Sequence, residues 1–187
     1  MVVRISTHIK IRISANCFCI PKLIKGKKVF QNSRYAILFA LREKNSIVTY
    51  RIFLADDHVL LRQGLKKILE EKGDLQVVGE ASDGFELLNL LNISPLTPHM
   101  VILDISMPNL GGIEATRKIK MIYPNIKVLI LSMHKIKEYL CHAISVGAEG
   151  YLLKEDADTE LFSAIEIIRR GGVYVSPLLS GNWSGGK

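Results

Sequence analysis

Five short apolar runs, each followed by a segment of helical periodicity, occupy the chain from residue 50 to about residue 170. The runs cover residues 51–55, 75–78, 100–103, 127–131 and 150–153. After the first run, Leu61, Leu65 and Leu69 recur at the spacing of an amphipathic helix. Strands that are apolar throughout, each followed by a helix, form a parallel sheet with helices on both faces. The pattern therefore predicts an α/β domain of about 125 residues.

The charge of the chain separates its first quarter from the rest. Residues 1–48 contain ten Lys and Arg and one acid, Glu43, which gives +9. Residues 49–187 contain fifteen Lys and Arg and seventeen Asp and Glu, which gives −2, so the two parts sum to the net charge of +7. We therefore predict a basic extension at 1–48, one domain at 49–175 and a tail at 176–187. The extension is expected to be disordered, or to reflect a gene start placed too far upstream.

Polar side chains follow four of the five apolar runs. Asp56 and Asp57 follow the first run, Asp104 the third, Ser132 the fourth and Lys154 the fifth. In open parallel sheets the carboxyl ends of the strands share one edge, where ligands bind. One Asp after a strand is often only a helix cap, but three carboxylates brought together repel one another unless a cation is present. The arrangement predicts a Mg²⁺ site, beside which an ammonium and a hydroxyl suit a phosphoryl group.

Longer motifs surround these positions: Leu-Ala-Asp-Asp-His at 54–58, Leu-Asp-Ile-Ser-Met-Pro-Asn at 103–109, Leu-Ser at 131–132 and Gly-Tyr-Leu-Leu-Lys at 150–154. Together they resemble the receiver domain of bacterial two-component response regulators, and most closely the receivers of the NarL/FixJ (LuxR-type) group. The resemblance covers residues 50 to about 175. It implies a flavodoxin-like (βα)5 fold of three layers, with the parallel strand order 2-1-3-4-5.

The resemblance also implies how the acidic residues act. Asp104 would be the phosphoacceptor, a carboxylate nucleophile that forms an acyl phosphate. Asp56 and Asp57 would hold Mg²⁺ together with Asp104 and the backbone carbonyl of Ser106. We expect His58, which follows the acid pair, to cap the next helix rather than to bind metal.

The remaining motif positions would act on the phosphoryl group or respond to it. Lys154 would neutralise its charge, as Mg²⁺ does, and Ser132 would donate a hydrogen bond to it. Tyr151 stands where the family has its switch aromatic, although a half-buried structural tyrosine is an alternative. Ser106 and His134 occupy the two positions that tune the lifetime of the phosphoryl group in this family.

The resemblance further implies partners and a class of function. The phosphoryl donor would be a sensor histidine kinase, and a homodimer could form through the first and last helices. Such a domain catalyses only its own phosphorylation and dephosphorylation and is not a multi-turnover enzyme. Three cysteines exclude a disulfide framework, and no apolar run reaches about 18 residues. We expect a cytoplasmic protein without a membrane partner.

NarL-type regulators continue into a helix-turn-helix domain, and residues 176–187 are too few to form one. DNA binding is therefore not expected from this chain, and both a single-domain receiver and a truncated LuxR-type transcriptional regulator remain open. A Mg²⁺-dependent phosphohydrolase with an Asp nucleophile is a second function class, but it would need a lid over its substrate. Nucleic-acid binding through the basic residues 1–48 is a third.

Overall fold

The computed structural model describes residues 2–4, 10–12, 22–24, 27–29 and 49–180. The chain divides into two units, Met1–Val48 and Thr49–Lys187. The rest of the predicted basic extension, and residues 181–187 of the predicted tail, lie outside the described residues.

The described part of the first unit consists of two antiparallel pairs of short strands. These are β1 (Val2–Arg4) with β2 (Lys10–Arg12), and β3 (Lys22–Ile24) with β4 (Lys27–Val29). Each strand has three residues, too few to give a recognisable period of two, and the sequence therefore predicts none of them.

The second unit is built on a six-stranded parallel sheet. Its strands are β5 (Tyr50–Ala55), β6 (Leu75–Ala81), β7 (Met100–Asp104), β8 (Lys127–Ser132), β9 (Gly150–Leu153) and β10 (Tyr174–Val175). They lie in the order β10-β9-β8-β7-β5-β6, and every neighbouring pair is parallel. The predicted order 2-1-3-4-5 is confirmed for the five main strands. The two-residue β10 adds a sixth strand beside β9.

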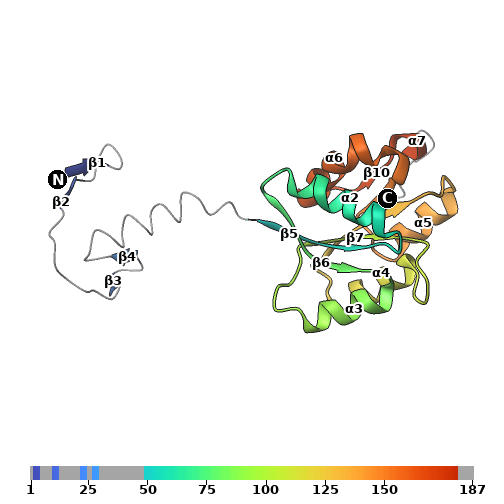
Figure 1. The fold of residues 1–187 in the computed structure, drawn as a ribbon, viewed down its shortest axis with the longest axis horizontal. Helices are drawn as coiled ribbons and strands as arrows, with labels where there is room; N and C mark the ends of the chain where they lie inside the picture. Colours follow the sequence, from blue (N-terminus) through green and yellow to red (C-terminus); the bar gives the residue numbers. More distant parts are fainter. Residues whose placement is uncertain (1, 5–9, 13–21, 25–26, 30–48, 181–187) are drawn as a thin grey trace. The chain divides into compact units, whose positions relative to one another are not determined.

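Helices cover both faces of this sheet (Figure 1). They are α2 (Val59–Glu70), α3 (Gly84–Ile93), α4 (Gly112–Ile122), α5 (Lys137–Ser145), α6 (Ala157–Arg169) and α7 (Pro177–Ser180), with a 3-10 turn η1 (Lys154–Asp156) after β9. None of the helices in this described part is long and apolar enough to cross a membrane.

Alternate residues of each central strand enter two separate hydrophobic cores. In β5, Ile52 and Leu54 pack in the core that α2 and α6 cover, whereas Phe53 and Ala55 pack in the core that α3, α4 and α5 cover. Because both faces of the strand are buried, the run is apolar at every position instead of alternating. This is the physical reason that the five runs were visible in the sequence.

Close backbone contacts fix the loops at the carboxyl edge. Asp83 caps α3, accepting a hydrogen bond of 2.8 Å from the N–H of Glu86. At Gly112, the first residue of α4, a Cβ atom would lie 2.1 Å from the carbonyl oxygen of Asp104. The start of α4 therefore packs directly against the end of β7, and only glycine allows this approach.

Candidate functional site

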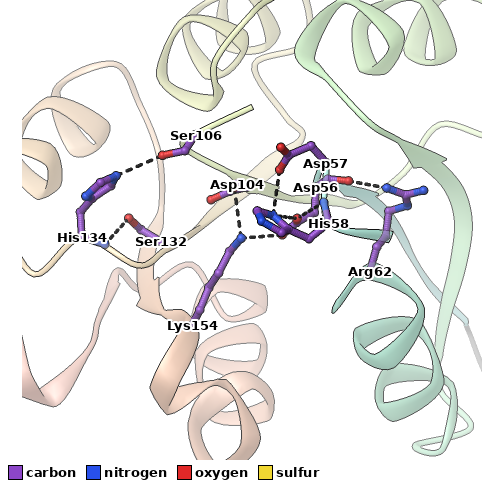
Figure 2. Close-up of polar contacts among 9 residues, drawn as sticks. All are labelled: Asp56, Asp57, His58, Arg62, Asp104, Ser106, Ser132, His134 and Lys154. Carbon is purple, nitrogen blue, oxygen red and sulfur yellow. Dashed lines mark hydrogen bonds and ion pairs between the residues drawn. The ribbon is translucent and has the colours of Figure 1, made fainter. Parts of the chain in front are cut away.

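The five polar residues predicted at the strand ends come together at one edge of the sheet (Figure 2). Asp56 and Asp57 follow β5, Asp104 ends β7, Ser132 ends β8 and Lys154 follows β9. Because β5, β7, β8 and β9 are consecutive neighbours in the sheet, their carboxyl ends converge. Asp56, Asp104 and Ser132 are buried, whereas Asp57 is exposed.

Lys154 forms a buried ion pair with two carboxylates. Its Nζ lies 2.8 Å from Oδ2 of Asp56 and 3.1 Å from Oδ2 of Asp104, and its side chain is 7% exposed. The contact with Asp56 is close but lacks hydrogen-bond geometry, so that oxygen has an ion-pair partner and no hydrogen bond. Two buried carboxylates thus share one ammonium, and a second cation would balance the charge.

The acidic residues also fit a divalent ion by their chemistry. Asp56, Asp57, His58 and Asp104 each offer one ligand atom, and these four atoms lie within 4.8 Å of one another. Carboxylate oxygens beside a buried negative charge are what Mg²⁺ binds in proteins. Receiver-type Mg²⁺ binding is therefore compatible with the donor set.

His58 lies differently from its prediction. It occupies the N-cap position of α2, but its side chain makes no capping hydrogen bond, so the expectation of a cap is wrong. Its Nδ1 lies 2.9 Å from Oδ1 of Asp57 and 3.2 Å from Oδ1 of Asp56. An imidazole lacks the short oxygen acceptor that caps need, and the two carboxylates attract the ring.

Hydrogen bonds at the loop after β8 connect four residues singled out from the sequence. Oγ of Ser132 accepts a hydrogen bond of 2.9 Å from the N–H of His134, and Nε2 of His134 lies 3.1 Å from Oγ of Ser106. The hydroxyl of Tyr151 donates to the carbonyl of His134 at 2.9 Å. Tyr151 is fully buried, which raises the pKa of its hydroxyl, while its contact with Ser132 acts in the opposite direction. That the carbonyl of Ser106 ligates metal stays a prediction.

The sequence did not predict an ion-pair network of Arg62, Lys66 and Glu80, here called the brace, which contacts the backbone of Asp56. Arg62 donates from Nη1 to the carbonyl of Asp56, and its Nε lies 3.3 Å from Oε2 of Glu80 (Figure 2 shows Arg62 and Asp56). Nζ of Lys66 lies 2.7 Å from Oε1 of the same carboxylate. The hydrogen bond from Lys66, more than the charge of Arg62, lowers the pKa of Glu80. The sequence did contain a signal for this network. Glu80 is the one acid in strand β6, and Arg62 and Lys66 stand four residues apart on one face of α2.

Known proteins of similar sequence point to one family. The family model of the response regulator receiver domain matches residues 52–166. The chain is 40% identical over 133 residues to the transcriptional regulatory protein DegU of Brevibacillus brevis, and 37% identical over 130 residues to the response regulator GacA of Pseudomonas protegens. These matches cover 71% and 70% of the chain, but only 55% and 60% of the two relatives. The chain thus matches less than two thirds of their length.

Solved structures agree with this. A crystal structure of a LuxR-family two-component response regulator from Aurantimonas sp. SI85-9A1 is similar at 36% identity and a TM-score of 0.67, covering 71% of the chain and 94% of that protein. The isolated REC domain of RcsB from Salmonella enterica, determined with the phosphomimetic BeF3⁻, is similar at 30% identity and a TM-score of 0.66. The latter match covers 71% of the chain and 97% of that domain. The chain belongs to the response regulator receiver domain family.

Proposed function

We propose that residues 49–175 are a phosphoaccepting receiver of a two-component phosphorelay, with Asp104 as the phosphoacceptor. The observation that carries the proposal is the position of Asp104. Its buried carboxylate ends the central strand β7, lies 3.1 Å from the ammonium of Lys154 and shares the edge with the acid pair Asp56 and Asp57. Phosphoryl transfer depends mostly on positioning and on neutralising charge, and this arrangement offers both.

The proposed reaction moves a phosphoryl group from a phosphohistidine of a sensor histidine kinase. An oxygen of Asp104 attacks the phosphorus, an O–P bond forms, and the N–P bond breaks with its electron pair going to the departing imidazole. Asp56, Asp57, Asp104 and the carbonyl of Ser106 would hold Mg²⁺, which supplies positive charge beside the transferring group.

Lys154 and Ser132 would receive the phosphoryl oxygens. The ammonium of Lys154 is already held between two carboxylates and can pair with an added anionic oxygen. The hydroxyl of Ser132 accepts from the N–H of His134 and would turn its own proton toward a phosphoryl oxygen. Movement of Ser132 would then pull on the loop whose carbonyl Tyr151 binds, which makes Tyr151 the proposed switch residue.

Partners beyond the kinase belong to the same proposal. A homodimer through α2 and α6 is proposed from the resemblance to NarL-type receivers. RcsB has been solved in complex with DNA, and those DNA contacts are a property of RcsB. For residues 49–180 of this chain we propose no DNA contact, since residues 49–187 have a net charge of −2 and the described residues are those of one receiver.

Acetyl phosphate labelling tests this function. Intact mass spectrometry should detect one added phosphoryl group on the full chain in Mg²⁺ and none in EDTA. Asp104→Asn should lose the label, because an amide oxygen is a poor nucleophile, whereas Asp158→Asn, a change of an exposed Asp in α6, should keep it. Labelling of Asp104→Asn at the wild-type level would exclude the assignment.

A further inference from the structure

His58 is the one member of the four-residue ligand group that the proposed phosphoryl transfer leaves without a task. Its ring nitrogen Nδ1 lies 2.9 Å from Oδ1 of Asp57 and 3.2 Å from Oδ1 of Asp56. The side chain is 67% exposed, so packing does not force the ring into this position. The attraction must therefore come from the two carboxylates.

Nδ1 of His58 lies close to two carboxylate oxygens at once, with Asp56 as its hydrogen-bond partner, and one metal ion could bind all three atoms. One N–H has one favourable direction, and only the contact with Asp56 has hydrogen-bond geometry, although the oxygen of Asp57 is closer. Ions that bind six ligands octahedrally at about 2.0–2.1 Å hold adjacent ligand atoms about 2.9 Å apart. The spacings of 2.9 Å and 3.2 Å match the edges of such a polyhedron.

We propose that His58 is a metal ligand, and that Nδ1 of His58 with the carboxylates of Asp56 and Asp57 binds a first-row transition ion more tightly than Mg²⁺. The inference rests on the proposed function for the position of the metal, but adds a nitrogen to an otherwise all-oxygen donor set. Imidazole favours transition ions, whereas Mg²⁺ prefers oxygen ligands and keeps its water. His58 thus changes which ion the site selects.

The nitrogen of His58 adds to the carboxylate oxygens of the site and replaces none of them. Asp56, Asp57 and Asp104 already offer carboxylate oxygens to Mg²⁺, and the ammonium of Lys154 pairs with both Asp56 and Asp104 (Figure 2). Replacing His58 should therefore leave the Mg²⁺ affinity close to its starting value and weaken the binding of a transition ion.

Mn²⁺ is the probe, because it accepts both carboxylate and imidazole ligands and has an electron paramagnetic resonance signal. The full chain is titrated with Mn²⁺ while the free ion is measured, and Mg²⁺ is added as a competitor. Electron spin echo envelope modulation then reports a directly bound imidazole nitrogen. His58→Gln and His58→Ala are compared with His142→Ala, in which an exposed histidine of α5 beside Arg117 is removed.

The wild-type chain and His142→Ala should show the imidazole modulation and bind Mn²⁺ more tightly than Mg²⁺. Both His58 variants should lose the modulation and bind Mn²⁺ at least about tenfold more weakly, with the Mg²⁺ affinity within about twofold of wild type. Mn²⁺ bound and displaced by Mg²⁺ without nitrogen modulation would overturn the role of His58 and leave the proposed function standing. No binding of either ion would overturn both.

Discussion

At the scale of single residues, the site depends on the balance of charge between two buried carboxylates and one buried ammonium. Asp56 and Asp104 are buried carboxylates, and Lys154 is the buried cation that the described residues place between them. An ion pair of this kind stabilises little by itself, but removing one partner leaves the other charge buried without compensation. The ammonium therefore compensates part of the buried negative charge and holds the two carboxylates together.

Replacing Lys154 by Met should expose this dependence. In EDTA, Lys154→Met should lower the free energy of unfolding by about 3–5 kcal/mol, because two buried carboxylates lose their shared cation. Mg²⁺ should restore more stability to this variant than it adds to wild type. Thermal and urea unfolding with and without Mg²⁺ measure both effects. Lys135→Met, which breaks the exposed pair with Glu155, is the control and should cost less than about 1 kcal/mol. Equal losses in the two variants would contradict the argument.

At the scale of elements, the start of α4 and the brace between α2 and β6 hold the acidic loops in place. Gly112→Ala should destabilise the domain by about 1–3 kcal/mol, since its Cβ would lie 2.1 Å from the carbonyl oxygen of Asp104. The same change at Gly64, in the exposed middle of α2 with no atom within 4 Å of the added Cβ, should stabilise by about 0.5–1 kcal/mol. Chemical denaturation measures the change in the free energy of unfolding for each variant. If both variants were stabilised or both destabilised, the packing explanation would be refuted.

The brace makes a prediction about pH. The pKa of Glu80 is lowered chiefly by its hydrogen bond with Lys66, so its ionised form stabilises the fold above its ordinary pKa near 4.5, and that contribution is lost as the pH falls through the lowered value. Glu80→Gln should therefore be less stable than wild type at pH 7, by under about 1 kcal/mol because the group is partly exposed. The difference should shrink below about pH 4.5. Denaturation at several pH values, with Glu71→Gln at the exposed end of α2 as control, measures this. If the difference in the free energy of unfolding between wild type and Glu80→Gln grows toward low pH, the brace is not its cause.

The elements also show how far the sequence alone reaches. Buried parallel strands are apolar throughout, so the five runs, their order by resemblance and the polar residues at their ends were visible. The strand β10 was not, because two residues carry no period and its pairing depends on distant contacts, such as the N–H of Tyr174 with the carbonyl of Glu149. Arg62 was missed because a side chain that binds a backbone carbonyl leaves no local pattern. For His58, the position at the helix start was correct, but the direction of the ring depends on the neighbouring charges.

At the scale of the whole molecule, the receiver is expected to be independent of the basic segment. Every residue of the described hydrophobic core lies between Tyr50 and Tyr174. Deleting residues 1–47 should therefore leave cooperative unfolding and labelling by acetyl phosphate unchanged, as calorimetry and mass spectrometry can test. Any retention of DNA by the full chain at low salt should disappear with the deletion, because ten Lys and Arg against one acid bind phosphates without reading bases. Sequence-specific DNA binding by residues 48–187 at about 200 mM salt would contradict this division.

The most direct test of the account is to locate the phosphoryl group on the wild-type chain. After treatment with acetyl phosphate and Mg²⁺, borohydride reduction converts an aspartyl phosphate to homoserine, and peptide mass spectrometry identifies the converted residue. We predict homoserine at Asp104 and unchanged aspartate at Asp56 and Asp57, since only Asp104 both pairs with Lys154 and lies at the end of β7, where its register partner Leu131 precedes Ser132. Conversion at Asp56 or Asp57 in place of Asp104, or none at any aspartate of the labelled chain, would contradict it.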